Sequence, residues 1–176
     1  RAHAVAYVMM SFRMAWYKVY YPVEFYATHF SSTVANFDAD TILKGPQACL
    51  SRIEEIKAMG NNATAKEQAD ILVLEVAYEM YARGYSFAPA RLGKSHALKF
   101  WSDEGKVLLP FVALEGVGDT AAKAFADAYK EKPFETIEEA VSRAKLNKTA
   151  VEALRAHGVL EGLPETDQLS LFAQLG

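Results

Sequence analysis

The sequence contains a single cysteine, no apolar run long enough to cross a bilayer, and only a small net charge. Cys49, the one cysteine among 176 residues, excludes a disulfide framework and any zinc site built from several cysteines. A lone thiol is typical of a reducing compartment. The apolar stretch over residues 2–12 is followed by Arg13 and Lys18, whereas a membrane-spanning helix needs about 20 residues. No small-residue cleavage pattern follows it, which argues against a signal peptide.

Neither sign of charge dominates the composition. There are 19 Lys or Arg and 22 Asp or Glu residues, which excludes a globally basic coat for nucleic acid but leaves room for a local basic patch. Because 51% of the residues are apolar and 23% are charged, the chain can bury a core and wholesale disorder is excluded. The length suits one domain or two small ones. The sequence opens inside a predicted helix without an initiating Met, so we expect a piece of a larger protein.

Apolar spacing and helix signals predict a helical first half. Apolar residues recur every three or four positions over residues 2–20, and Pro22 ends that helix. Thr64 and Glu67 form a predicted capping box at the start of a helix over residues 64–83. We expect its central apolar segment, residues 71–74, to be buried on all sides. Further helices are predicted over residues 23–30, 38–43 and 46–59.

Beyond residue 83 the pattern changes. Short apolar segments predict a β ribbon of two or three strands over residues 84–109, with Asp103-Glu104-Gly105 as one turn. Helical spacing returns over residues 110–162, where helix, turn and helix occur twice. Residues 163–176 are predicted to be an exposed, extended tail. The predicted fold class is mostly α: a helical segment, a small β ribbon, a helical module and a C-terminal tail.

The most informative local pattern is Leu114-Glu115-Gly116-Val117-Gly118, placed between two predicted helices. Gly116 and Gly118 allow a tight turn and leave the amides at the second helix's N-terminus open to an anion, while Val117 can anchor the turn in the core. This pattern resembles the helix-hairpin-helix motif, which holds a backbone phosphate without reading bases. The alternative is an ordinary glycine-rich turn. Because Glu115 and Asp119 flank the turn and would repel phosphate, we expect weak binding.

The second half of this module shows a more ordinary pattern. Thr136 and Glu139 predict another capping box, and residues 146–149 predict a turn. This turn lacks the glycine pair, so we interpret it as a structural partner of the first hairpin, with Lys148 as a phosphate candidate. Across residues 110–162, nine acidic side chains outnumber seven basic ones.

Two further segments carry candidate binding residues. Residues 83–99 contain no acid, and aromatic Tyr85 and Phe87 interleave with the basic residues Arg83, Arg91, Lys94, His96 and Lys99. Basic groups beside aromatic rings suit a nucleic-acid backbone and stacked bases; the alternative is a solvated strand face. Near the N-terminus, His3, Tyr7 and Met10 share one helical face close to Arg1. They could contact triphosphate oxygens and a base, but the sequence alone favours core residues of a buried helix.

The tail carries a candidate docking peptide, Gln168-Leu169-Ser170-Leu171-Phe172. Leucine and phenylalanine on an otherwise polar segment can fill an apolar hole on a partner, while Gln168 bonds at its rim. The alternative is a terminal strap that packs on its own domain.

Taken in order, these motifs resemble the C-family bacterial replicative polymerases, and within them the PolC-type DNA polymerase III alpha subunit. The resemblance rests on residues 1–7 (Arg-Ala-His-Ala-Val-Ala-Tyr), on Ala15-Trp16-Tyr17-Lys18 with Tyr21-Pro22, on Gly84-Tyr85-Ser86-Phe87, and on Lys94-Ser95-His96-Ala97 before the hairpin and tail. It covers essentially the whole chain. Arg1 departs from the family, which more often has lysine there, although a basic side chain is kept.

The resemblance implies a role for each region of a C-terminal polymerase fragment. Residues 1–109 would be the distal fingers, including the ribbon at 84–109, with Arg1, His3 and Tyr7 touching the incoming dNTP. Residues 110–162 would be a tandem helix-hairpin-helix domain on primer-template DNA. Residues 163–176 would be the tail that docks on the sliding clamp (beta subunit) through Gln168, Leu169, Ser170, Leu171 and Phe172. We assign Arg91, Lys94, Lys99, Gly116, Val117, Gly118 and Lys148 to DNA.

The resemblance also implies that the chemistry lies elsewhere. Family members transfer nucleotides with two Mg²⁺ ions held by carboxylates, which would lie in a palm upstream of residue 1. Asp38-Ala39-Asp40 sits in a predicted short helix or loop, so we assign no catalytic or metal residue and no cofactor here, and expect the chain alone to be inactive. We expect a cytoplasmic, replisome-bound protein with no membrane partner. The alternative is a stand-alone, non-enzymatic DNA-binding or clamp-adaptor protein.

Overall fold

The structure, a computed structural model, describes residues 2–166 and divides into two compact units. Unit 1 comprises the chain up to Ala88 together with Lys99–Leu108, and unit 2 comprises Pro89–Leu98 together with the chain from Leu109 onward. Residues 89–98, which lie within the predicted ribbon, thus pack with the helical module. The fold is mostly helical with a small sheet, as predicted.

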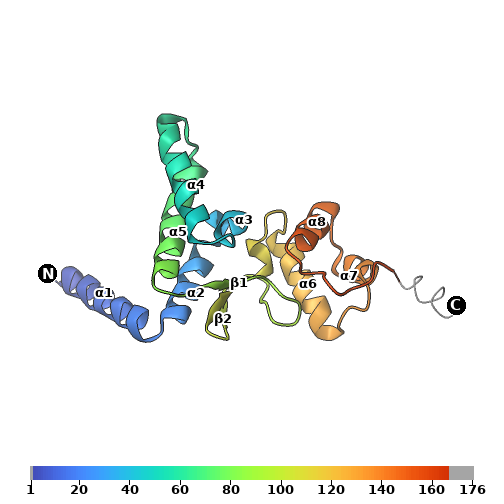
Figure 1. The fold of residues 1–176 in the computed structure, drawn as a ribbon. Helices are drawn as coiled ribbons and strands as arrows, with labels where there is room; N and C mark the ends of the chain where they lie inside the picture. The colour runs from blue at the N-terminus through green and yellow to red at the C-terminus, as the bar shows by residue number, and fades with distance from the viewer. Residues whose placement is uncertain (1, 167–176) are drawn as a thin grey trace, which may run out of the picture. The chain divides into compact units, whose positions relative to one another are not determined.

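The helices of unit 1 begin and end close to the predicted residues (Figure 1). Helix α4, Pro46–Met59, matches its prediction at both ends, with proline in its first turn and Gly60 just beyond its last residue. The other helices of unit 1 are α1 (Ala2–Tyr20), α2 (Pro22–Ser32), α3 (Ala39–Ile42) and α5 (Ala65–Ala82), with 3-10 turns η1 (Val34–Asn36) and η2 (Gly60–Asn62).

Side-chain caps explain where two of these helices start. The predicted capping box of α5 is confirmed: the Glu67 amide donates to Thr64 Oγ1 at 3.2 Å, and the Thr64 amide donates to Glu67 Oε2 at 2.9 Å. At α3, Asp38 Oδ1 accepts from the Thr41 amide at 2.9 Å. The Asp38 carboxylate is therefore used as a helix cap.

The core of unit 1 is aromatic. Tyr26 and Phe30 of α2 are fully buried. The Phe30 ring centroid lies 5.0 Å from that of Phe87, and the Phe37 centroid lies 4.8 Å from that of Phe100. These contacts join α2 to the sheet, and the segment after η1 to the segment before β2, so burial of large rings holds together parts of the chain far apart in sequence.

The sheet is smaller than the predicted ribbon and is partly parallel. Strands β1 (Phe87–Ala88), β2 (Trp101–Asp103) and β3 (Lys106–Leu108) have the order β1-β3-β2. Strands β2 and β3 are antiparallel, and the predicted turn between them is confirmed, with positive φ at Glu104 and Gly105. Strand β1 pairs parallel to β3. It ends where Pro89, which has no amide hydrogen, cannot extend the ladder.

One burial expectation is wrong. The segment 71–74 of α5 was expected to be buried on all sides, but Leu72 is 67% exposed while Val73 and Leu74 are buried. Helix α4 runs beside α5 and covers only part of its circumference (Figure 1). A run of four apolar residues therefore places at least one side chain on the uncovered face.

Unit 2 is built on three helices around Phe125. They are α6 (Asp119–Glu131), α7 (Ile137–Ala144) and α8 (Lys148–Ala156), preceded by the 3-10 turn η3 (Phe111–Ala113). The Phe125 ring centroid lies 5.0 Å from that of Phe111 and 5.4 Å from that of Phe134. The helix predicted to begin at Pro110 is thus a single 3-10 turn that leads directly into the glycine pattern.

The capping box predicted at α7 forms only in part. Thr136 Oγ1 accepts from the Glu139 amide at 3.0 Å, but Glu139 Oε2 accepts from the Glu135 amide at 2.7 Å and not from that of Thr136. Glu139 Oε1 also accepts from Arg143 Nη1 at 2.9 Å. Arg143 additionally donates to the carbonyls of Lys132 and Ala128, which ties α7 to the end of α6.

Unit 1 contains two buried groups, Cys49 and Tyr26, and one half-buried group, Tyr81, whose raised pKa predicts a loss of stability at alkaline pH. Burial raises the pKa of the Cys49 thiol to about 11 and those of the Tyr26 and Tyr81 phenols to about 12. In the unfolded chain these groups ionise near pH 9 to 10, so their contribution to stability is complete below that range and is lost as pH rises through the folded values.

We expect the free energy of unfolding, measured by denaturant titration with circular dichroism, to fall steeply between pH 9 and pH 12. Tyr81→Phe removes one ionising group together with the hydrogen bond to the Ile42 carbonyl. That variant should start less stable and lose less on raising the pH. An unfolding free energy that stays level up to pH 11 would contradict the prediction.

Candidate nucleic-acid interface

The first hairpin runs from η3 into α6. The Val117 amide donates to the Leu114 carbonyl at 3.0 Å, which closes the turn, and the Val117 side chain is buried. Gly116 has φ 95°, a conformation that favours glycine. Gly118 follows with φ −76° and ψ 164° as the N-cap of α6. The turn thus places Gly118, with open space around its Cα, directly before the first turn of α6.

The two glycines serve different purposes. A Cβ at Gly116 would lie 3.0 Å from Thr149 Cγ2 and 3.4 Å from the Thr149 carbonyl oxygen, so this residue allows the first hairpin to pack closely against the start of α8. A Cβ at Gly118 would meet nothing within 4 Å. Gly116 is therefore needed for packing, whereas Gly118 leaves open space before α6.

The second hairpin repeats two backbone features of the first without glycine, namely a residue of positive φ and, two residues later, an extended N-cap residue. Lys145 occupies the left-handed region at φ 51° and ψ 45°, Leu146 is buried, and Asn147 caps α8 with φ −80° and ψ 166°. The Asn147 side chain accepts from the Ala150 amide at 2.8 Å. Lys145, Leu146 and Asn147 thus correspond in order to Gly116, Val117 and Gly118.

The sequence did not predict that the two turns correspond, because the second turn lacks the glycine pair of the first. The signal that remains is a buried apolar residue directly before an N-cap residue, which Leu146-Asn147 shares with Val117-Gly118. A left-handed conformation costs a lysine roughly 1–2 kcal/mol relative to glycine, a cost that the surrounding packing can offset.

The two hairpins differ in the sign of their charge. Glu115 and Asp119 flank the first turn, and the corresponding positions at the second turn are Ala144 and Lys148. Lys145 adds a further cation there. The Lys148 side chain is 91% exposed, and its Nζ lies 3.7 Å from Glu152 Oε1, so the pair is largely screened by solvent. The local charge is therefore more positive at the second hairpin than at the first.

A cavity of about 540 Å³ lies beside the second hairpin, between α6 and the α7–α8 turn. Small side chains of α6 leave it open, including Ala121 and Ala124, and Lys145 and Asn147 form part of its wall. Asp127 and Glu131 bring acidic groups to the same cavity. Its mixed lining makes it a poor site for a free anion.

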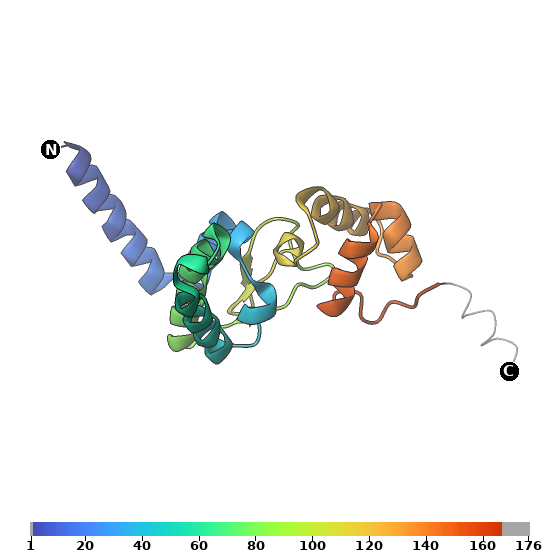
Figure 2. The ribbon, with the colours of Figure 1, turned by 90° about the horizontal axis from the view of Figure 1, so that it is seen from above.

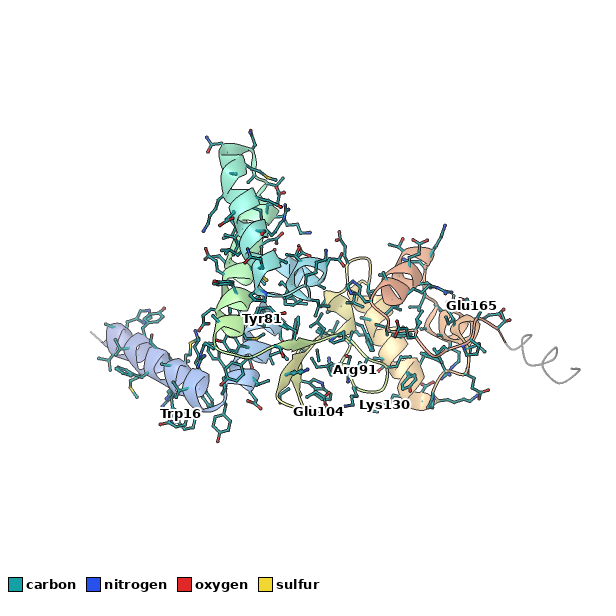
Figure 3. All side chains as sticks on the ribbon, in the orientation of Figure 1. Trp16, Tyr81, Arg91, Glu104, Lys130 and Glu165 are labelled. Carbon is teal, nitrogen blue, oxygen red and sulfur yellow. The ribbon has the colours of Figure 1, made fainter. Side chains whose placement is uncertain are left out.

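The basic residues predicted on a ribbon lie instead in the loop 89–98 and just beyond it. Ser95 holds the loop: its amide donates to the Arg91 carbonyl at 2.9 Å, and its hydroxyl donates to the Leu109 carbonyl at 2.7 Å. A Cβ at Gly93 would lie 3.2 Å from Tyr129 Cε1. Arg91 (Figure 3) and Lys94 are thus exposed on an ordered loop of unit 2, whereas Lys99 belongs to unit 1.

Helix α1 is exposed, so the expectation that His3 and Tyr7 are core residues is wrong. Every described side chain from residue 3 to residue 17 is exposed, and Tyr7 is 65% exposed. The ring of His3 meets that of Tyr7 edge-on with centroids 5.0 Å apart, which keeps both on one face. Figure 2 shows α1 extending away from the other helices of unit 1, and Figure 3 marks Trp16 on it. Arg1 lies outside the described residues.

The described chain ends as a strap on α7 and α8. The amides of Ile137 and Glu138 donate to the carbonyls of Pro164 at 2.9 Å and Glu165 at 3.1 Å. The Glu165 carboxylate (Figure 3) pairs with both terminal nitrogens of Arg155. The predicted docking peptide, Gln168 to Phe172, lies outside the described residues.

The charged side chains that the structure describes do not form a metal site. Over residues 2–166 no three His, Cys, Asp or Glu side chains are grouped so that they could hold a metal ion. Asp38, the first residue of the Asp-x-Asp pattern, has its Oδ1 engaged as the cap of α3. Nor is any helix within this range both long and apolar enough to span a bilayer.

Residues 84–169 match a family model described as a helix-hairpin-helix motif. The match extends over the sheet, the basic loop, both hairpins and the strap. The resemblance of the first turn to this motif is thereby confirmed, and the second turn, Lys145–Asn147, which the sequence analysis interpreted as a structural partner, lies in the same matched region.

Curated relatives match almost the whole chain. It is 46% identical to "DNA polymerase III PolC-type" of Clostridium perfringens, 49% identical to the protein of that name from Caldanaerobacter subterraneus subsp. tengcongensis, and 41% identical to that of Bacillus subtilis. Each match covers 172 residues, which are 98% of this chain and 12% of the relative. The resemblance to PolC-type polymerases is thus confirmed for a segment about an eighth as long as these relatives.

The different surroundings of the two glycines lead to a prediction about stability. Gly116→Ala should destabilise unit 2 by about 2 kcal/mol, because alanine is strained at positive φ and its methyl group would crowd Thr149. Gly118→Ala is the matched control: its backbone conformation suits alanine and nothing lies nearby, so we expect a change within about 1 kcal/mol. Chemical denaturation of both variants tests this. Equal losses would mean that Gly116 has no packing role.

Proposed function

Because this chain matches PolC-type DNA polymerase III along 98% of its length, we propose that it is the part of a bacterial replicative polymerase that grips primer-template DNA and the incoming dNTP. The observation that carries the proposal is the pair of hairpins that share a positive-φ residue and an extended N-cap, inside a region that matches the helix-hairpin-helix family. Bond formation belongs to other parts of the polymerase. The same similarity supports a cytoplasmic place in the replisome and does not favour a stand-alone adaptor.

DNA binding divides unequally between the two hairpins. Lys145 and the exposed Lys148 place two cations at the second hairpin, beside the start of α8, so this hairpin supplies most of the phosphate affinity. Gly116, Val117 and Gly118 offer amides at the first hairpin, but Glu115 and Asp119 weaken them. The basic residues Arg91, Lys94 and Lys99 supply further phosphate contacts. Contacts of this kind position the duplex without reading its sequence.

The exposed face of α1 supports nucleotide contact. His3 and Tyr7 present a ring pair to solvent on the helix that Arg1 precedes. A basic group can meet the triphosphate while an aromatic ring meets the base. This face is available for such contacts because no part of the described chain covers it.

The tail is proposed to dock on the sliding clamp (beta subunit). Leu171 and Phe172 are the apolar anchors, Gln168 bonds at the pocket rim, and Leu169 and Ser170 complete the peptide. The strap at Pro164 and Glu165 supports this role, since it attaches the chain to α7 and α8 a few residues before the peptide begins.

The described residues contain no group of side chains that fits a Mg²⁺ site. Nucleotidyl transfer in these polymerases uses Mg²⁺ held by carboxylates, but Asp38 caps a helix and residues 2–166 contain no suitable donor cluster. The Mg²⁺ site of the polymerase is therefore proposed to lie in other parts of the protein, and the isolated chain to be inactive.

The charge difference between the hairpins predicts which lysines matter for DNA. Lys145→Gly combined with Lys148→Ala removes two cations and keeps the left-handed turn, since glycine adopts it freely. Duplex affinity should fall, and the slope of log K against log salt should decrease by up to about 2. Fluorescence anisotropy with a primed duplex at several salt concentrations measures both.

Lys130→Ala, at the far end of α6 (Figure 3), is the control that changes net charge without touching a hairpin; its slope should match the parent chain. Glu115→Gln should raise affinity by relieving repulsion at the first hairpin. If the double variant keeps the parent slope, the second hairpin does not contact phosphate. Primer extension by the chain alone, with dNTP and Mg²⁺ added, would disprove the proposed inactivity.

We expect the short peptide in the tail to account for clamp binding by itself. Alanine at Leu171 and Phe172 should abolish binding to a purified bacterial sliding clamp in surface plasmon resonance, at a cost of about 2 kcal/mol or more for each anchor. Leu175→Ala, three residues beyond Phe172, is the matched leucine control and should leave binding intact. Retention of clamp binding by the double variant would refute docking through this peptide.

A further inference from the structure

Within residues 2–166, helix α1 contacts the rest of the chain only near its C-terminal end. Its described side chains from residue 3 to residue 17 are exposed, and Lys18 is the first that is partly buried. At the junction with α2, Tyr21 has non-helical backbone angles and Pro22 has no amide hydrogen to donate. Among the described residues, the contacts that set the direction of α1 therefore lie at its last turn (Figure 2).

A polar cluster occupies that last turn, and we call its four members, Lys18, Tyr26, Glu79 and Arg83, the α1 joint. Arg83 Nη2 donates to the main-chain carbonyl of Lys18 at 3.0 Å, and Lys18 Nζ lies 2.9 Å from Glu79 Oε2. Two contacts from the end of α5 thus reach α1 directly, one of them to its backbone.

Tyr26 links the two residues of α5. Arg83 Nη1 donates to the Tyr26 hydroxyl at 2.9 Å, and that hydroxyl donates to Glu79 Oε2 at 2.8 Å. Tyr26 has no exposed surface, so its ring is held by the core of unit 1. The hydroxyl consequently fixes the guanidinium and the carboxylate that grip α1.

At neutral pH the protonation states of Tyr26 and Glu79 favour the contacts of the α1 joint. Burial raises the pKa of Tyr26 to about 12, so its hydroxyl stays a donor. Glu79 is partly desolvated, but hydrogen bonds from Lys18 and Tyr26 outweigh this and lower the pKa of its carboxyl group. The ammonium of Lys18 also lies 5.6 Å from the Phe25 ring centroid.

A small rotation at the α1 joint would move the far end of α1 by a distance that matters for nucleotide contact. At about 1.5 Å per residue, His3 lies roughly 22 Å along the helix from Lys18. A rotation of about 5° at the joint would displace His3 by about 2 Å, whereas reacting groups must be placed within about 1 Å to be effective. The contacts of α1 with a nucleotide therefore require a joint that is stiff to within a few degrees.

We propose that Lys18, Tyr26, Glu79 and Arg83 are positioning residues that set the direction of α1 and thereby the place where His3 and Tyr7 meet the incoming nucleotide. This inference rests on the proposed nucleotide contact of α1. The geometry of the joint, however, can be tested without any nucleotide.

Electron spin resonance distance measurements test the joint itself. Spin labels on cysteines at Met10 in α1 and Leu72 in α5, both exposed, report the direction of α1, and buried Cys49 can stay in place. Tyr26→Phe removes only the hydroxyl, and Arg83→Gln removes the grip on the Lys18 carbonyl. Both should broaden the distance distribution severalfold. Arg52→Gln, which breaks the ion pairs with Glu55 and Glu67, is the control and should not.

Steady-state kinetics test the functional consequence. In a full-length PolC-type polymerase carrying this segment, Tyr26→Phe and Arg83→Gln should raise KM for dNTP about tenfold, change kcat less, and leave the Kd for primer-template unchanged. Arg83→Lys, which keeps the charge and can still reach a carbonyl, should restore part of the loss. Arg52→Gln should have the kinetics of the parent.

The two measurements separate the possible failures. Unchanged distance distributions in both joint variants would overturn the joint. Broadened distributions with an unchanged KM would overturn its role in nucleotide binding and, with it, the proposed contact through His3 and Tyr7. Should Tyr26→Phe fail to fold, the variants at Arg83, whose side chain is partly exposed, keep both tests decisive.

Discussion

The left-handed residue at each hairpin turn is the constraint on which unit 2 depends. Gly116 and Lys145 reverse the chain so that the next residue enters the core and the one after it caps a helix. That single conformation buries Val117 and Leu146 directly before the N-cap residues of α6 and α8. At Gly116 it also brings the backbone close to Thr149, where a Cβ would be crowded. The packing of unit 2 and its proposed anion binding thus depend on one backbone feature.

The two hairpins have similar backbone angles but opposite local charges, so we expect them to contribute unequally to phosphate binding. The acidic residues beside the first turn stabilise the N-terminus of α6 itself, because negative charge is favourable there, but they oppose an external phosphate. The second turn has Lys145 and Lys148 in its place. The overall excess of acidic residues therefore says little about where DNA would bind, since the local sign at each amide cluster decides the attraction.

In unit 1, by contrast, the long helix α1 makes few contacts with the rest of the described chain. A wide apolar and aromatic surface on α1 is exposed, far more than an isolated domain usually shows. Its direction depends on four side chains at one end, with a fully buried tyrosine at their centre. A helix held in this way can present its whole length to other molecules, provided that the joint is stiff.

Local signals in the sequence determined the helix ends, the capping box of α5 and the β2–β3 turn, because proline, glycine and N-cap chemistry act within a few residues. They also identified the first hairpin. Only the tertiary structure decided that α1 is exposed, that Leu72 faces solvent, that β1 pairs in parallel, and that Lys145 takes the place of a glycine. Periodicity shows which residues share a face but not whether a partner covers it, and the cost of a left-handed lysine is met by packing that no local pattern encodes.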